Sequence, residues 1–524
     1  MLPSKIVKIL IPILFVLLAV LLLCRPLDQD NILFSGDIGF VFSVAEGIVN
    51  RLEVPLLGPS SHIGGRHLGA WYFYLVAFFY FITQKSVLLT VYCMIAVKVL
   101  ALFIPLYLYS SLIISKKYDY IISVVAGFIL ILTCCNQQFA PLRMPWHGAD
   151  LIIGSGILMT GIYYWVFRGQ VGVFLLSSSL AFQLHFGFGP SVAAAAICGI
   201  LIKPFRPLSN TSVLFNRICI VLTFFIWIPF VVFLIKYSAL SPFASITSGH
   251  LHQETDFFKV LISNLHTLFA ESVTLHRSYI SRGWTLIATI LLIVIAIKRS
   301  LIAQNLRIIA TIICLCILPI IFTLILASIL GQDLDSYIWF TSYSSIMILQ
   351  ALVCGLIFSC LSTRFLNNIF CSMLFLLLIK VVYFEWNHKY TNPYPIFNTI
   401  PGVKALVSVV QQQSGKSGYP FSIKGKDSIA GSESAGYFFL GPQYYPFHDT
   451  SNRFPELPSF RDRADKDTAK LLITDKLQFD QSYIRPWQRR GWKINQSEVV
   501  NVNIVSDATP EVNVVSLNLT TLAR

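Results

Sequence analysis

A glycine-rich stretch with one arginine and two histidines stands out among the polar residues of this chain. It reads GPSSHIGGRHLG from Gly58 to Gly69 and contains Arg66 and His67. Glycines let backbone amides approach a sugar or an anion closely, and arginine and histidine side chains pair with phosphate oxygens. The stretch predicts a ligand site at Arg66 and His67; the alternative is an ordinary solvent-exposed turn.

Carboxylates precede this stretch in the same polar segment. Asp37 lies in the sequence GDIG, with Asp28, Asp30 and Glu46 near it. A mostly apolar chain keeps polar residues beside a membrane chiefly where something is bound or reacted. Asp37 is therefore the leading candidate for a catalytic residue.

A second polar cluster, RMPWHGAD, runs from Arg143 to Asp150 between two apolar stretches. Arg143, His147 and Asp150 are candidates to bind polar groups of a ligand. In the alternative interpretation the cluster is simply the start of a helix, whose macrodipole favours the carboxylate of Asp150. The residue types do not decide between the two.

Two further polar positions lie within long apolar runs. His185 and Gln183 belong to FQLHFGFGP, where glycine and proline interrupt the run, and a broken helix at membrane depth usually lines a cavity. His185 is thus a candidate binding residue, with a satisfied core histidine as the alternative. Lys98 has no carboxylate in its own run, so we expect it to snorkel or to mark a break between two short helices.

Metal and disulfide chemistry find little support in the sequence. No spacing of His and Asp demands a metal, although a divalent ion is an open alternative for neutralising a phosphate. All eleven cysteines fall at or before Cys371, mostly in apolar runs, and are explained as small buried hydrophobes.

The elements that position these residues are membrane helices. The chain has 524 residues, of which 55% are hydrophobic and 12% charged, with a mean hydropathy of +0.70. Soluble domains carry about 25% charged residues, so we predict a polytopic α-helical membrane protein of about 10 to 13 spans. The apolar runs that predict them are 6–23, 87–114, 121–133, 151–167, 171–202, 218–235, 285–297, 308–330, 338–361 and 369–384.

Charge placement predicts the topology. Lys5 and Lys8 precede the first apolar run, which we interpret as an uncleaved anchor, and they hold the amino terminus in the cytoplasm. The loop 26–69 is then extracytoplasmic. The net charge of +14 is explained by such topology signals, and we expect no nucleic-acid partner.

The composition changes after Phe384, and 386–524 contain no run that could cross a membrane. We predict a membrane domain, 1–385, and a small soluble α/β domain, 386–524, that lies outside the cytoplasm if the number of crossings is odd. A helix is expected around 403–413, strands at 470–474 and 499–506, and a hairpin whose turn is 507–510.

The order of these motifs carries a resemblance. GDIG, then PLLGPSSHIGGRHLGAWYFYL, Lys116-Lys117, LRMPWHGAD and FQLHFG resemble bacterial members of the protein O-mannosyltransferase-like, aminoarabinose transferase-like family of GT-C membrane glycosyltransferases. The match covers about the first 200 residues. Relatives often carry a second acid four residues after the loop aspartate, where this chain has Val41. Many read Trp-Asn-Pro where it has Trp146-His147-Gly148.

The resemblance implies a chemistry. Asp37 would be the general base, and a sugar would pass with inversion from a polyprenyl-phosphate donor to an envelope acceptor such as a glycolipid, polysaccharide or protein. Arg66, His67, Arg143, His147, Asp150 and His185 would bind substrate. A bacterial inner-membrane location with a periplasmic site is implied as well.

Two other functions compete with this one. A transporter or flippase of a lipid-linked or anionic solute would show internal repeats and intramembrane ion pairs, and the sequence shows neither. A non-catalytic envelope assembly protein would accommodate the absence of an acid at Val41.

Overall fold

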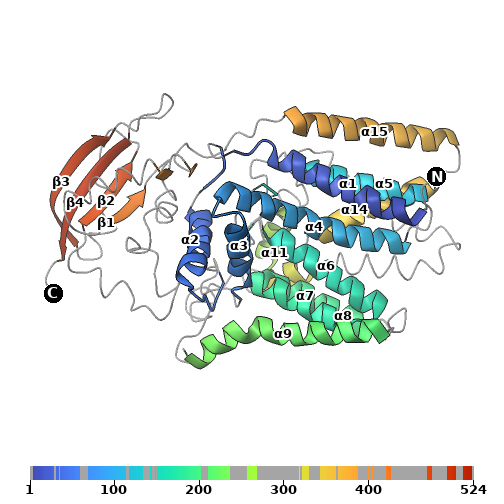
Figure 1. The fold of residues 1–524 in the computed structure, drawn as a ribbon, viewed down its shortest axis with the longest axis horizontal. Helices are drawn as coiled ribbons and strands as arrows, with labels where there is room; N and C mark the ends of the chain where they lie inside the picture. Colours follow the sequence, from blue (N-terminus) through green and yellow to red (C-terminus); the bar gives the residue numbers. More distant parts are fainter. Residues whose placement is uncertain are drawn as a thin grey trace. The chain divides into compact units, whose positions relative to one another are not determined.

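The computed structural model describes residues 4–28, 31–34, 36–58, 69–113, 117–133, 142–143, 148, 150–201, 210–236, 257–267, 318, 321–329, 341, 343–360, 364–387, 399–400, 403–404, 421–425, 469–474, 492–502 and 512–521. Helices precede strands in the chain (Figure 1). The helices are α1 (Ser4–Cys24), α2 (Gly36–Arg51), α3 (Trp71–Ile82), α4 (Val87–Ile113), α5 (Lys117–Thr133), α6 (Leu151–Arg168), α7 (Val171–Leu184), η2 (Phe186–Phe188), α8 (Gly189–Leu201), α9 (Asn210–Lys236), α11 (Phe257–Thr267), α14 (Tyr343–Cys360) and α15 (Arg364–Asn387). The strands are β1 (Phe421–Gly425), β2 (Ala469–Thr474), β3 (Trp492–Val502) and β4 (Val512–Thr521).

Several of these helices have the length and composition of membrane spans. Within the described residues, four are long and apolar enough to cross a membrane: Val87–Leu112, Leu151–Arg168, Val213–Ile235 and Arg364–Asn387. Shorter apolar helices include Ile9–Cys24, Trp71–Ile82 and Tyr120–Leu132. The expected class of helical membrane protein is confirmed. The count of 10 to 13 spans stays a prediction, because the run 285–297 and most of 308–330 lie outside the described residues.

The chain forms two compact units. The first comprises Met1–Pro26, Leu57–Tyr72 and Val91–Lys389, and the second Leu27–Leu56, Phe73–Thr90 and Tyr390–Arg524. The expected division at residue 386 stays a prediction.

In the first unit, glycines on α6 allow close helix packing. A Cβ on Gly156 would lie 1.9 Å from the backbone oxygen of Ala101 in α4, and one on Gly161 would lie 2.5 Å from Cβ of Ser177 in α7. Small residues at such positions let helix backbones approach each other within a membrane. The approach at Gly156 therefore sets how α4 and α6 lie against each other.

The long apolar run 171–202 is interrupted in the middle, as the glycines and proline of FQLHFGFGP predict. The helix α7 ends at Leu184, His185 is extended with φ −160° and ψ 135°, and η2 and α8 follow. The break is local, because Phe188 packs within the core and would lie 2.7 Å from a Cβ on Gly154.

In the second unit, the segment expected to be a loop contains the helix α2. Its buried residues Ile38, Val41, Phe42 and Ala45 recur at the spacing of one helix face. Phe42 packs edge-on against Tyr80 of α3, with ring centroids 6.0 Å apart. This periodic pattern is visible in the sequence and was the signal for a helix within the polar loop.

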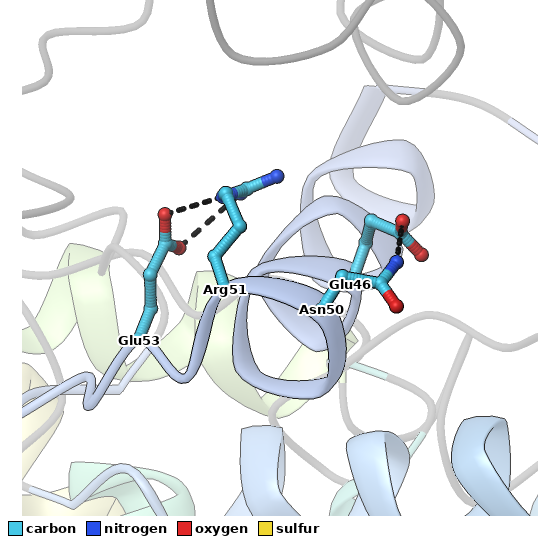
Figure 2. A network of polar contacts seen from close by, with 4 residues as sticks. All are labelled: Glu46, Asn50, Arg51 and Glu53. Carbon is cyan, nitrogen blue, oxygen red and sulfur yellow. Dashed lines mark hydrogen bonds and ion pairs between the residues drawn. The ribbon is translucent and has the colours of Figure 1, made fainter.

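Polar contacts hold the carboxyl end of α2. Arg51 pairs with Glu53 at 2.7 Å, and Asn50 donates to Glu46 (Figure 2). Lys85, in the turn between α3 and α4, donates to Oδ1 of Asn50 at 2.5 Å. Exposed pairs of this kind contribute about 1 kcal/mol or less each. Their effect is to fix where α2 ends relative to the α3–α4 turn.

The strands of the second unit form one sheet with the order β1-β2-β4-β3. The pair β1–β2 is parallel, whereas β4 runs antiparallel to both β2 and β3. The expected strand at 470–474 and the pairing of the last two strands are confirmed. The turn 507–510 and most of the helix expected at 403–413 lie outside the described residues, so the α/β character of this domain stays a prediction.

Residues beyond the last membrane helix also contact the segment before α2. Leu33 and Thr399 form an isolated antiparallel bridge, and Phe34, Ile400 and Val403 are buried. The second unit thus joins the start of the tail to the residues that lead into α2.

We predict that Gly156→Ala destabilises the protein by about 1–3 kcal/mol, because the new methyl group would overlap a backbone oxygen that cannot rotate away. Gly189→Ala in α8 is the matched control, since its Cβ would lie 3.4 Å from the ring of Phe182, an ordinary contact. Thermal unfolding in detergent measures both. Equal unfolding temperatures for the two variants would contradict the close approach of α4 and α6.

Candidate functional site

Asp37 is the second residue of α2. A carboxylate in the first turn of a helix interacts favourably with the macrodipole. The side chain itself is outside the described part of the chain, so its partners and its catalytic role stay predictions. Val41, four residues on, is 1% exposed and packs in the core of the second unit. That burial explains why an acid is absent at this position.

Lys98 and Asp150 form a buried ion pair in the first unit. Nζ of Lys98 lies 2.5 Å from Oδ1 of Asp150, and the hydroxyl of Tyr72 donates to Oδ2 of the same carboxylate. The side chains of Lys98 and Asp150 are 1% and 0% exposed. An unpaired charge at this depth would cost several kcal/mol, so each group requires the other.

This geometry corrects two expectations. Lys98 neither snorkels nor marks a break, because α4 is continuous through it and its ammonium group is buried against Asp150. The sequence also showed no sign of an ion pair between membrane helices. The pair of Lys98 and Asp150 in the first unit corrects that expectation. The partner was missed because it lies in the polar cluster before the run 151–167, far from the lysine in the sequence.

Asp150 does precede a helix, as one interpretation held. It is the residue before α6, its backbone oxygen accepts a hydrogen bond from the amide of Ile153, and its side chain makes no capping bond. The carboxylate is instead engaged by Lys98 and Tyr72. The arrangement favours a structural role for Asp150 over direct contact with a ligand.

Arg143 forms a second buried pair. Its Nη2 lies 2.5 Å from Oε2 of Glu385 in α15, and its Nε donates to the backbone oxygen of Leu23 in α1 at 3.1 Å. Both charged side chains are fully buried. The guanidinium joins the ends of α1 and α15, which favours structure over phosphate binding.

The cluster RMPWHGAD is therefore fixed at both ends. Its first residue, Arg143, and its last residue, Asp150, each form a buried ion pair. His147 lies between them, outside the described residues, and its role as a ligand stays a prediction. Among the residues that are described, no group of three His, Cys, Asp or Glu side chains could hold a metal ion.

The residues that follow the glycine-rich stretch contact the other two clusters. A Cβ on Gly69 would lie 2.0 Å from Oε1 of Gln183, the indole of Trp71 donates to the backbone oxygen of Leu180 at 2.8 Å, and Tyr72 reaches Asp150. The exit of the glycine-rich stretch is thus anchored to α7 and to the start of α6. Arg66 and His67 themselves lie outside the described residues.

Gln183 fills the space beside Gly69. It is fully buried, and its Nε2 donates to the backbone oxygen of Ile226 in α9 at 3.2 Å. Only a residue without a side chain fits against it at position 69. This explains one glycine of GPSSHIGGRHLG by packing.

His185 lies at the break between α7 and η2. Its Nδ1 accepts a hydrogen bond from the amide of Gly187 at 2.9 Å, and the residue is 8% exposed. With Nδ1 as an acceptor, the neutral ring carries its proton on Nε2. The ring is oriented by its own turn, so the satisfied core histidine and the binding histidine both remain compatible with the geometry.

The comparisons give no match to a family model or a curated protein. Solved structures do match. ArnT from Cupriavidus metallidurans in the apo state is 10% identical, with a TM-score of 0.53 over 96% of this chain and 97% of that chain. The same protein bound to undecaprenyl phosphate gives 0.54 with the same identity and coverage. An Archaeoglobus fulgidus oligosaccharyltransferase tethered to an acceptor peptide is 12% identical, with a TM-score of 0.44 over 90% and 69% of the two chains.

The chain therefore has the fold of ArnT over nearly its whole length. The expected GT-C resemblance is confirmed at the level of fold. At 10% identity the likeness carries no residue assignments, so the substrate-binding and catalytic residues rest on the chain's own geometry.

We predict that Lys98→Met and Asp150→Asn each destabilise the protein by about 3–5 kcal/mol, because each leaves a buried charge without the opposite charge of its ion pair. The double variant Lys98→Met/Asp150→Asn should cost less than the sum of the two single variants, since both charges are then removed. Thermal unfolding in detergent completes the cycle. Strictly additive losses would show that the two groups do not interact.

We predict that Val41→Asp destabilises the protein by about 3 kcal/mol, because a carboxylate would be buried in the core beneath α2. Leu52→Asp is the control. Leu52 is 83% exposed with φ 54°, a conformation that suits aspartate better than leucine. Unfolding temperatures compare the two, and a Val41→Asp protein as stable as the wild type would refute the core position.

Proposed function

We propose that the chain is a membrane glycosyltransferase that transfers a sugar from a polyprenyl-phosphate donor to a cell-envelope acceptor. The observation that carries the proposal is the shared fold with ArnT, which spans 96% of this chain and 97% of that one. The crystal structure of ArnT with undecaprenyl phosphate supports a donor of that lipid class. A fold alone does not define a reaction, so the chemistry is argued from residues below.

Asp37 is the general base of this proposal. An acceptor hydroxyl attacks the anomeric carbon as its proton passes to the carboxylate of Asp37, and the bond from that carbon to the phosphate oxygen breaks. The polyprenyl phosphate leaves with the bonding electron pair. Because attack and departure occur on opposite faces, the anomeric centre inverts. The place of Asp37 in the first turn of α2 supports a charged carboxylate that is ready to accept the proton.

The phosphate requires cations or hydrogen-bond donors, because charge develops on it as the sugar departs. We assign this task to Arg66, His67 and His147, with His185 as a further donor through Nε2. Arg143 and Asp150 are assigned to the framework, since buried ion pairs already engage them. The two pairs engage residues 143 and 150, which flank His147 in the sequence. Gly69 and Tyr72, which follow Arg66 and His67 in the chain, contact Gln183 and Asp150.

A transporter is the second class to be tested. Buried ion pairs such as that of Lys98 and Asp150 are common inside transporters. In this chain the two charges also fix how α4 packs against the start of α6. A non-catalytic assembly protein was suggested by the absence of an acid at Val41. The burial of Val41 explains that absence through packing.

The test is transfer of radiolabelled sugar from a panel of polyprenyl-phosphate sugars to envelope glycolipids in membranes that contain the protein. We predict that Asp37→Asn lowers transfer about 10²- to 10⁴-fold, the usual contribution of a general base, at unchanged expression. The configuration of the transferred sugar reports inversion.

Asp28→Asn is the matched control. Oδ1 of Asp28 accepts from the amide of Asn31 at 2.8 Å, and an asparagine oxygen can accept the same bond. This variant should retain wild-type transfer. Full activity of Asp37→Asn would refute the general-base role, and absence of transfer across a broad panel, with solute uptake by proteoliposomes, would favour the transporter.

A further inference from the structure

An apolar groove lies between α1 and α4 in the first unit. Its volume is about 830 Å³, and both helices contribute exposed apolar side chains, among them Leu17 and Leu21 of α1 and Leu100 and Ile104 of α4. The other side of α1 packs on α5, where the rings of Phe15 and Phe128 are 4.7 Å apart. The two helices run alongside each other (Figure 1). Exposed apolar side chains in a membrane helix face hydrocarbon, so the groove is filled by chains and not by water.

The length of the groove matches one leaflet of a bilayer. On α1 it extends from Ile13 to Cys24, a rise of about 17 Å along a helix, and Arg25 follows directly. The hydrocarbon core of a bilayer is about 30 Å thick, so the acyl chains of one leaflet span about 15 Å. A phospholipid acyl chain therefore fits the groove from end to end, whereas a long polyprenyl chain would extend beyond it.

One end of the groove is charged. Arg25 lines it there, and its guanidinium lies 4.4 Å from the ring centroid of Trp386 at the end of α15. Tryptophan is enriched at the level of lipid headgroups, which places this end at the membrane surface. The guanidinium lies over the ring, and a cation held in this way keeps N–H groups that can donate to an oxyanion. No ion pair engages Arg25 among the residues that the structure describes.

We propose that this groove binds one anionic glycerophospholipid of the surrounding bilayer, with an acyl chain between α1 and α4 and its phosphodiester at Arg25. Basic positions at the ends of grooves between membrane helices bind acidic lipid headgroups in this way. The lipid joins two helices across a space that their own side chains leave open. The site is independent of the proposed transfer reaction.

The test is lipid binding to the purified, delipidated full-length protein by native mass spectrometry. Phosphatidylglycerol and phosphatidylcholine with the same acyl chains are titrated against the wild type, Arg25→Gln and Leu100→Trp. We expect the wild type to favour phosphatidylglycerol by about fivefold, the effect of one arginine near a headgroup. Arg25→Gln should abolish that preference, and Leu100→Trp should reduce binding of both lipids because the indole fills the groove.

Arg364→Gln and Leu14→Trp are the matched controls. Arg364 is an exposed arginine at the start of α15, Leu14 is 55% exposed on α1, and neither lines the groove. Both should bind like the wild type. Equal affinity of the wild type for the two lipids, or the same losses in the control variants, would overturn the proposal. A polyprenyl phosphate arm is included, and stronger binding of that lipid, lost in Arg25→Gln, would overturn it in favour of a donor site.

Discussion

The buried pair of Lys98 and Asp150 is the constraint on which much of the first unit depends. Two charges inside a membrane protein are tolerated only when their geometry satisfies both, so α4 and the start of α6 have to meet at one fixed level. Two turns further along α6, Gly156 brings the helix backbone against Ala101. The ion pair and the glycine contact therefore define the same helix interface. Tyr72, bound to the same carboxylate, ties the exit of the glycine-rich stretch to that interface.

The pair of Arg143 and Glu385 extends this argument to the polar cluster. One ion pair engages residue 143 and the other residue 150, so both ends of the cluster are tied to membrane helices. The guanidinium of Arg143 also donates to the backbone oxygen of Leu23, which adds α1 to the contact with α15. The buried charges at the two ends of the cluster therefore act in helix packing.

Sequence patterns predicted the positions of the helices better than they predicted the contacts between them. Apolar runs gave α1, α4, α5, α6 and α9 because burial in hydrocarbon depends on composition, and the break at His185 followed from glycine and proline. The ion-pair partners of Lys98 and Arg143 were not predictable, because residues far apart in sequence meet through tertiary packing. The helix α2 was readable from its apolar periodicity, but the polar residues of that loop drew the interpretation away from it.

The candidate site shows the same division. The clusters were recognised from residue type, yet two of the residues singled out, Arg143 and Asp150, are occupied by protein partners. An arginine in a polar segment between membrane helices looks the same in the sequence whether it binds a phosphate or pairs with a carboxylate of another helix. Only the position of that carboxylate in the folded protein distinguishes the two roles. Glu385 supplies that carboxylate from the last span, beyond the reach of any local pattern.

These features explain how the fold of ArnT persists at 10% identity. Helices in a membrane require apolar surface, small residues at close approaches and satisfied charges, and many sequences meet these conditions. A fold alone does not define a reaction, so residues outside these helix contacts can change while the helices remain. The departure at Val41 concerns the local packing of α2, because that side chain is buried in the core of the second unit.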